Sequence, residues 1–395
     1  MKEEVWMKEL QEQMVQWRRH LHMNPEISFQ ESRTAAFVAA KLKQWDIEVR
    51  ENVGGHGVIG TIRGTQPGPV VMLRADMDAL PIEDEKDCEY RSTVKGSMHA
   101  CGHDGHTSML LGTAAYFSRH RDSIKGEIRF LFQPAEELLP GGAVSVIREG
   151  GLEGVDVIYG IHLWTPLPSG TAASCAGAMM AAADDFYIEL TGKGGHGGMP
   201  QATIDSVVAG SALVMQLQSV VSRSVDPLQP AVLTVGTIHG GSAQNVIAET
   251  CKLSGTVRTF DEHSRSVMKE RLHTITEQTA AAYGTSASIE YIMGYPPVVN
   301  DAEEAGRFFR EAASVFGASG VQESPKLMPA EDFAYYLQQV SGCFMFVGAG
   351  NPEKGAAYPH HHPKFDFDED VMLDGVKLFI RMSEAYAEQH SARKA

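Results

Sequence analysis

The chain has 395 residues, which is long for one domain of ordinary size, so two domains are expected. Hydrophobic residues make up 43% of it and charged residues 21%, as in ordinary globular proteins. The formal net charge of −16 argues against nucleic acid or an anionic membrane as the main partner, because both would repel an acidic surface.

Three further features of the sequence predict a cytoplasmic location. Five scattered cysteines do not form the pattern of a disulfide framework. The N-terminal segment is amphipathic and acidic, unlike a signal peptide. No window approaches 18 uninterrupted apolar residues, so no transmembrane helix is expected.

The first part of the chain alternates between helical and strand patterns. Helical periodicity covers 1–22 and 31–45, with Pro25 between them. Three short apolar runs follow and predict buried strands, separated by helical patterns at 108–120 and 143–149; the runs are 70–73, 128–132 and 155–161. This alternation predicts an α/β domain with a mainly parallel mixed sheet sandwiched by helices.

The pattern changes in the middle of the chain. We expect a strand at 186–190, a helix at 204–222, strands at 232–239 and 250–259, a helix at 262–283 and a strand at 286–293. This β-α-β-β-α-β order is ferredoxin-like. It predicts an inserted α+β lid and dimerisation domain at 184–294, within a discontinuous catalytic domain at 1–183 and 295–395. Because an exposed sheet edge invites pairing, we expect a homodimer or higher oligomer through the insert.

Polar side chains follow each of the three predicted parallel strands. The first strand leads into Asp76 and Asp78, the second into Glu136 and Glu137, and the third into His162. Ligands of open α/β sheets bind beyond the carboxyl ends of the strands. The sequence therefore predicts a functional site at this edge.

The segment 98–107, MHACGHDGHT, points to a metal at that site. Cys101 and His103 are two residues apart, so in an extended segment they would point the same way. A structural zinc site would use a second Cys/His pair at matched spacing, and none is present, so a catalytic metal is favoured. The alternative is a glycine-rich turn with a buried cysteine and solvated histidines.

The candidate ligands are a thiolate, imidazoles and a carboxylate, namely Cys101, His103, Glu137, His162 and one histidine of the run 360–362. This set suits Zn²⁺, Mn²⁺, Co²⁺ or Ni²⁺. Five ligands exceed the need of one tetrahedral ion, so two ions are expected, with Cys101 as a candidate bridge. Of the adjacent Glu136 and Glu137, one could bind metal while the other faces the metal-bound water as a general base. The alternative is that the two glutamates only line the first turn of a helix.

For several other residues the sequence gives weaker evidence of a functional role. Asp76 and Asp78 could be ligands, but the ligand list is full, so we expect them to orient the histidines instead. In the insert, His196 lies in a glycine-rich loop and Asn245 follows another. Arg258 is a lone cation on an apolar strand and could meet a substrate carboxylate, although an ion pair on the strand surface would explain it almost as well.

Together these motifs resemble the amidohydrolase branch of the two-metal aminoacylase and carboxypeptidase superfamily. That branch includes N-acyl-amino-acid amidohydrolases, hippurate hydrolases and indole-acetic-acid–amino-acid hydrolases. The resemblance spans nearly the whole chain. Its landmarks are WRRHLH (17–22), RADMDALP (74–81), MHACGHDGHT (98–107), QPAEE (133–137), GIHLW (160–164), GGHGGMP (194–200), GTVRTF (255–260), AEDFAYY (330–336) and HHPKF (361–365).

The resemblance implies a role for each candidate residue. It implies that the metals are bound by Cys101, His103, Glu137, His162 and His361, where His361 is selected over His362 because the family's ligand is followed by one variable residue and then proline. It implies Glu136 as the base. It also implies that His196 polarises the scissile carbonyl, across a dimer interface, and that Asn245 and Arg258 hold the substrate.

The expected activity is hydrolysis of N-acyl-L-amino acids, such as N-acetyl or N-benzoyl derivatives, to a carboxylate and a free amino acid. A metal-bound hydroxide would attack the amide carbonyl while Glu136 moves the proton. One alternative is a dipeptidase or carboxypeptidase on the same scaffold. Another is a metal-containing binding protein, which would be expected to have lost the base or a ligand.

Overall fold

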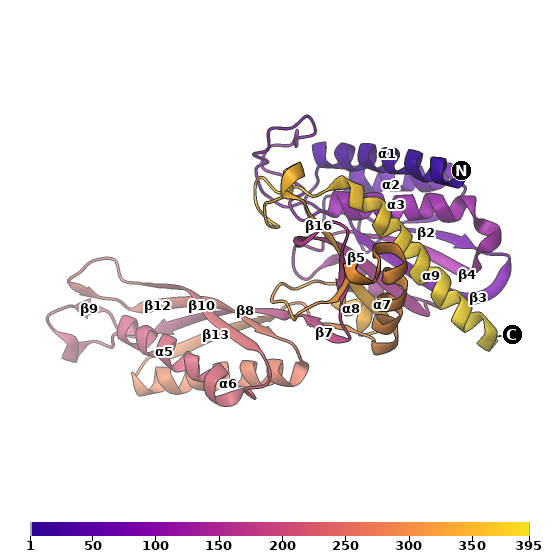
Figure 1. Cartoon of the computed structure of the whole chain (residues 1–395). Coiled ribbons are helices and arrows are strands. Elements are labelled where there is room, and N and C mark those ends of the chain that lie inside the picture. Colours follow the sequence, from indigo (N-terminus) through magenta and orange to yellow (C-terminus); the bar gives the residue numbers. More distant parts are fainter. Residues whose placement is uncertain (1, 395) are drawn as a thin grey trace. The chain divides into compact units, whose positions relative to one another are not determined.

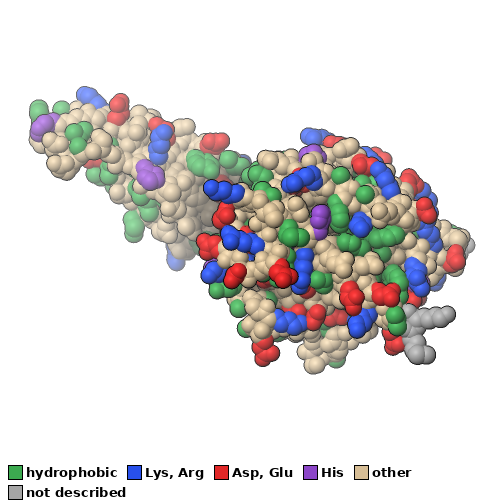
Figure 2. All heavy atoms as spheres, turned by 90° about the horizontal axis from the view of Figure 1, so that it is seen from above, with side chains coloured by type: hydrophobic (Ala, Val, Ile, Leu, Met, Phe, Trp, Pro, Cys, Tyr) green, Lys and Arg blue, Asp and Glu red, His purple; other side chains and the backbone are tan. Residues whose placement is uncertain are grey.

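The computed structural model describes residues 2–394, which form two compact units. The larger unit contains the stretch up to Gly177, Val299–Pro325 and the stretch from Asp332 onward, and the smaller contains Ala178–Val298 and Lys326–Glu331. Among the described residues, no helix combines the length and apolar composition needed to span a bilayer. On the face drawn in Figure 2, acidic and basic side chains are interspersed, so the net negative charge forms no single patch there.

The larger unit is built on an eight-stranded mixed sheet (Figure 1). The strand order is β1-β2-β4-β3-β5-β16-β6-β15. These strands are β1 (Glu48–Val53), β2 (Gly57–Arg63), β3 (Gln66–Asp76), β4 (Lys125–Gln133), β5 (Val157–Pro168), β6 (Ala172–Ser174), β15 (Val321–Glu323) and β16 (Gly342–Gly350). In the centre of the sheet, β3 pairs in parallel with β4 and β5, and β5 pairs in parallel with β16. The predicted α/β class with a mainly parallel sheet is confirmed, and the three predicted strands lie in β3, β4 and β5.

Helices flank this sheet and bury its apolar faces. They are α1 (Lys2–Met23), α2 (Ser32–Gln44), α3 (His103–Arg119), α4 (Gly142–Arg148), α7 (Ala302–Phe316), α8 (Ala334–Leu337) and α9 (Met372–Lys394). Short 3-10 turns of the larger unit lie at Arg121–Ser123, Ala318–Gly320, Pro352–Lys354 and Glu369–Val371, and one of the smaller unit lies at Pro200–Ala202. The helix α3 packs between α1, α9 and β3 and is buried along most of its length. Its first residue, His103, is therefore held firmly.

The smaller unit has the β-α-β-β-α-β order expected from the sequence. Its antiparallel sheet has the order β10-β12-β8-β13, and α5 and α6 pack on it around one apolar core. The elements are β8 (Ala182–Thr191), α5 (Ser206–Ser224), β10 (Ala231–Gly240), β12 (Thr250–Thr259), α6 (Glu262–Ala282) and β13 (Ser286–Met293), with the short strands β9 (Gly195–His196) and β11 (Val246–Ile247). The short strands β7 (Gly177–Met180) and β14 (Val298–Asn300) each cross a boundary between the two units along the chain. In β8 every second residue is buried, as expected for a strand with one face in a core.

Some boundaries differ from the sequence expectations. The helix predicted at 108–120 begins five residues earlier, at His103, and the third strand continues to Pro168 instead of ending before His162. The helix predicted at 1–22 corresponds to α1, and residue 1 lies outside the described residues. The hairpin β1-β2, which pairs antiparallel at the edge of the large sheet, was not predicted. The residues of β1 are mostly polar, and glycines interrupt the apolar residues of β2.

Candidate metal centre

Loops at the carboxyl ends of the central parallel strands bring the predicted ligands together in the larger unit. The Sγ atom of Cys101 lies 3.5 Å from Nε2 of His162, which belongs to β5. Nε2 of His103 lies 3.7 Å from Oε1 of Glu137, in the loop after β4. Nε2 of His361 lies 3.3 Å from the same oxygen. All five residues predicted as ligands therefore gather at one place.

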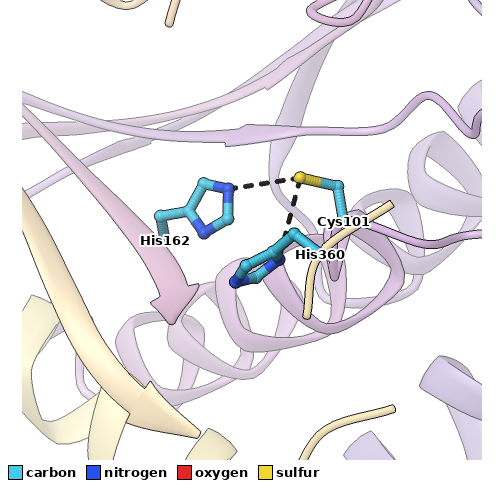
Figure 3. A group of neighbouring side chains, drawn as sticks. All are labelled: Cys101, His162 and His360. Atoms are coloured by element: carbon cyan, nitrogen blue, oxygen red, sulfur yellow. Dashed lines mark hydrogen bonds between the residues drawn. The ribbon is translucent and has the colours of Figure 1, made fainter. Parts of the chain in front are cut away.

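Side chains of the types that bind metals form two overlapping groups that share Cys101. One group contains Cys101, His103 and Glu137, and the other contains Cys101, His162 and His360 (Figure 3). Within each group all ligand atoms lie within 4.8 Å of one another. The sulfur of Cys101 is common to both groups, and it brings His162 near the group that contains His103 and Glu137.

The expectation that Cys101 and His103 lie in an extended segment is wrong. Gly102 has a φ of 94°, and this left-handed residue turns the chain directly into α3, whose first residue is His103. The two side chains reach the same site because one precedes the turn and the other begins the helix. His361 also has a left-handed backbone, with a φ of 64°, and its N–H donates to the carbonyl oxygen of Ala100 (2.8 Å). Such strained residues concentrate at functional sites.

Two buried polar atoms fit a bound cation. Among the described residues, Nε2 of His103 and Oε1 of Glu137 have no hydrogen-bond partner, although both atoms are buried. Unpaired buried polar atoms are rare because each costs free energy. Two ligands bound to one tetrahedral zinc ion would lie about 3.4 Å apart, close to the observed separation of these atoms. The donor set is therefore chemically and geometrically suited to a divalent transition metal.

Fixed hydrogen bonds determine which nitrogen of two histidines faces this site. Nδ1 of His103 lies 2.9 Å from the carbonyl oxygen of Asp78, and Nδ1 of His162 lies 2.7 Å from that of Leu163. A carbonyl oxygen only accepts, so each Nδ1 carries a proton and donates it. Nε2 is then left to bind a metal, as is usual for histidine ligands whose other nitrogen is hydrogen-bonded.

Two neighbouring histidines have the opposite arrangement. The backbone N–H of Leu163 donates to Nε2 of His106 (2.9 Å), and that of Thr165 donates to Nε2 of His360 (3.3 Å). A backbone N–H only donates, so both neutral rings carry their proton on Nδ1. His106 donates that proton to Oδ1 of Asp76 (2.6 Å). His106 and His360 therefore have no lone pair left for a metal at this site.

Two of the predicted ligands, His103 and Cys101, hold protons more strongly than usual in the metal-free site. Burial alone would lower the pKa of His103, but the carboxylates of Asp76, Asp78 and Glu137 outweigh it and raise that pKa to about 10. Burial raises the pKa of the Cys101 thiol well above its usual value, and Glu137 adds to the effect. Metal binding by His103 and Cys101 would therefore release protons from both groups.

Asp76 and Asp78 both contact histidines at the site. Oδ1 of Asp78 lies 3.3 Å from Nδ1 of His103, and the hydroxyl of Ser28 donates to the other carboxylate oxygen of Asp78 (2.7 Å). Asp76 accepts from His106 and from Nη1 of Arg74 (2.6 Å). Burial alone would raise the pKa of Asp76, but the two histidines and Arg74 hold it well below the usual carboxyl value. Both aspartates are thus placed where they fix the orientation of imidazole rings.

The two adjacent glutamates lie in an irregular loop. The stretch between β4 and α4, which begins at Gly142, is not helical, so the alternative that they only line a first helical turn is wrong. Ala135, directly before them, has a φ of 54°, and its N–H donates to Oε1 of Glu31 (2.8 Å). Oε2 of Glu136 lies 4.0 Å from Nε2 of His103. Glu136 therefore faces the same group of atoms as Glu137.

The three residues predicted in the insert lie in the smaller unit, and two of them are neighbours. His196 in β9 is opposite Val246 of β11, and the N–H of Gly197 donates to the carbonyl oxygen of Asn245 (2.8 Å). Arg258 lies near the far end of β12, away from this loop, where its Nη1 donates to the carbonyl oxygen of Val257 (3.1 Å). The smaller unit thus joins His196 with Asn245 but does not join Arg258 to them.

The chain matches a known protein family over most of its length. The model of Peptidase family M20/M25/M40 matches residues 72–385. The chain belongs to this family.

Several relatives are similar over most of their length. The N-acetyl-L-cysteine deacetylase of Bacillus subtilis is 43% identical over 364 residues, which cover 92% of this chain and 86% of the relative. The N-acyl-L-amino acid amidohydrolase of Geobacillus stearothermophilus is 49% identical over 292 residues, which cover 74% and 79%. Among solved structures, the YXEP protein of Bacillus subtilis, described as a dinuclear metal binding peptidase from the M20 family, has a TM-score of 0.83 at 33% identity and covers 96% of this chain and 99% of its own. This M20/M25/M40 chain is thus similar to amide-bond hydrolases along almost all of its sequence.

Sequence reasoning missed His106 and gave His360 no role of its own. The signal for His106 was present, because it follows His103 by three residues and such residues share a helix face. The role of His360 depends on the N–H of Thr165, more than 190 residues away in the chain. No local pattern could have revealed that contact.

Proposed function

We propose that the protein hydrolyses the amide bond of N-acyl-L-amino acids to a carboxylate and a free amino acid. The observation that carries the proposal is the convergence of Cys101, His103 and Glu137 beside Glu136, where buried ligand atoms lack a hydrogen-bond partner among the described residues. Relatives named N-acyl-L-amino acid amidohydrolase and N-acetyl-L-cysteine deacetylase favour this activity. The alternative activity, a dipeptidase or carboxypeptidase, uses the same chemistry with a different acyl group.

The proposed site holds two divalent ions, Zn²⁺, Mn²⁺, Co²⁺ or Ni²⁺, on Cys101, His103, Glu137, His162 and His361. When bound, the ions would supply Lewis-acid polarisation of the amide carbonyl. Glu136 would take a proton from the attacking water and pass it to the leaving amine. Asp78 and the carbonyl oxygen of Leu163 would keep the two ligand imidazoles in the required tautomer.

His196, Asn245 and Arg258 are proposed to act on the substrate. The N–H of Gly198 donates to Nδ1 of His196 (3.0 Å), so the neutral ring carries its proton on the exposed Nε2. A donor of this kind suits polarisation of the scissile carbonyl oxygen. Asn245 and Arg258 would hold the substrate, with Arg258 meeting its carboxylate.

A substrate panel tests the proposed activity. Protein loaded with Mn²⁺, Co²⁺ or Zn²⁺ is given N-acetyl and N-benzoyl amino acids and free-amine dipeptides of the same amino acids. We expect kcat/KM to be higher for the acylated substrates. A preference for the dipeptides would favour the peptidase instead, and failure to hydrolyse any amide would favour a binding protein.

We also propose that the chain forms a homodimer through a lid domain at 184–294, and that it is cytoplasmic. Supporting the dimer, exposed apolar side chains lie on the edge strand β10 (Ile238) and on α5 (Val208 and Met215). A lysine at a sheet edge opposes pairing with a second copy. We expect sedimentation equilibrium to give the dimer mass for the wild type and the monomer mass for I238K, whereas V5K, which alters an exposed valine of α1, should stay dimeric. A monomeric wild type would reject the dimer.

A further inference from the structure

We infer that His360 is a positioning residue for the thiolate of Cys101, to which it donates a hydrogen bond from Nδ1, and that it is not a metal ligand. The inference rests on the proposed metal site. His360 lies directly before His361, the histidine assigned as a ligand, but its ring groups with Cys101 and His162, whereas His361 contacts Glu137. Figure 3 shows the ring of His360 and the ring of His162 both directed toward the sulfur of Cys101.

The backbone of β5 determines which nitrogen of His360 carries the proton. The N–H of Thr165 points at Nε2 (3.3 Å), and this nitrogen must therefore be the acceptor. The proton of the neutral ring is then on Nδ1, which lies 4.0 Å from Sγ of Cys101. If Nδ1 were a ligand, the proton would have to move to Nε2, where it would face the N–H of Thr165.

Aromatic packing prevents the ring from turning over. His360 stacks on Trp164 with ring centroids 4.7 Å apart and planes 23° apart, and Trp164 stacks in turn on Phe346 (4.7 Å, 24°). The ring centroid of Phe365 also lies 4.9 Å from that of His360. Trp164 and Thr165 belong to β5, as does His162. One strand thus fixes both the ligand imidazole and the hydrogen-bond donor that face the same sulfur.

A donor at this position has a chemical reason. The thiolate of Cys101 would share its surroundings with the carboxylates of Glu136 and Glu137, so negative charge is concentrated there. An N–H group stabilises the charge on sulfur without taking a coordination position on a metal. Hydrogen bonds to a ligating sulfur draw electron density from it and change the electronic properties of the metal–thiolate bond.

Cobalt spectroscopy on the full-length protein tests this role. The probe is Co²⁺ alone, whose sulfur-to-metal charge-transfer band reports the electron density on Cys101. The variant H360F keeps an aromatic ring against Trp164 but removes the donor, and H360N keeps an amide N–H near the position of Nδ1. The matched control is H362F, since His362 is also stacked on an aromatic ring, Tyr358, but outside the site.

We expect H360F to bind as many cobalt ions as the wild type and to shift the charge-transfer band to longer wavelength. H360N and H362F should keep the band at the wild-type position. If H360F does not fold, as judged by circular dichroism, H360M replaces it as the variant without a donor.

Two results would overturn the inference. Loss of a cobalt ion from H360F and H360N together would show that His360 is a ligand. An unshifted band in H360F would show that no hydrogen bond is made. Absence of the band from the wild type would instead contradict the metal site on which the proposed function depends.

Discussion

Replacing Glu136 by glutamine should lower the turnover of N-acyl amino acids by about 10²–10⁴-fold, the usual contribution of a general base. Glutamine has the size of glutamate but cannot take a proton from the attacking water. Because Glu136 is assigned no coordination role, bound metal measured by atomic absorption should stay at the wild-type level. The comparison of kcat with metal content thus separates catalysis from metal binding.

The adjacent residue provides a matched control. Oε1 of Glu137 lies within 3.7 Å of Nε2 of His103 and within 3.3 Å of Nε2 of His361, so the variant E137Q should lose metal as well as activity. If E136Q retained near-normal turnover, Glu136 would not be the base. If both variants lost metal equally, the division of roles between the two glutamates would be wrong.

The sequence contained most of the information on where the site lies. Buried apolar runs followed by Asp76, Glu136 and His162 predicted three neighbouring parallel strands, and the sheet has β4, β3 and β5 side by side. Apolar residues recur every two positions in a strand and every 3.6 positions in a helix. This pattern is local, so it is visible in the sequence before the fold is known. The order of the smaller unit was predicted for the same reason.

The sequence did not contain the orientation of the side chains. Whether a histidine offers Nε2 or Nδ1 depends on a backbone group that reaches it from another element, such as the carbonyl oxygen of Asp78 for His103 or the N–H of Thr165 for His360. The sequence also could not reveal the turn at Gly102, because the letter G does not show whether a glycine has a left-handed or an extended backbone. The motifs therefore predicted the set of donor residues, and the fold showed which nitrogen of each histidine faces the site.

The motif at 17–22 supports the family resemblance, but the sequence predicted no function for its residues. The structure shows that Arg18 and His22 in this motif belong to a network of buried ion pairs. The guanidinium of Arg18 is fully buried and contacts three carboxylates, those of Asp104 (2.9 Å), Asp366 (2.6 Å) and Glu369 (3.0 Å). Asp104 also accepts from Nδ1 of His22 (2.6 Å). Since Asp104 directly follows His103 at the start of α3, this network ties the beginning of that helix to α1 and to the C-terminal region.

Replacing Arg18 by methionine should therefore lower the free energy of unfolding by about 3–5 kcal/mol, because it leaves buried carboxylates without their counterion. The measurement is the midpoint of urea-induced unfolding of the metal-free protein, followed by circular dichroism. The control is R19M. Arg19 pairs with the same Glu369 (2.6 Å) but its side chain is 42% exposed, and surface pairs contribute only about 0–1 kcal/mol.

The pH dependence of this difference gives a second test. Burial alone would raise the pKa of Asp104, but Arg18 and His22 hold it well below the usual carboxyl value. A carboxyl whose pKa is depressed on folding stabilises the protein above the unfolded pKa of about 3.9, and this contribution is lost as the pH falls through the folded pKa. The gap between wild type and R18M should thus be largest near neutral pH and should narrow in acid. If R18M and R19M unfolded at the same urea concentration, or if the gap did not change with pH, the ion pairs of Arg18 would not be what fixes the start of α3, and the position of His103 would have to depend on the apolar packing of that helix alone.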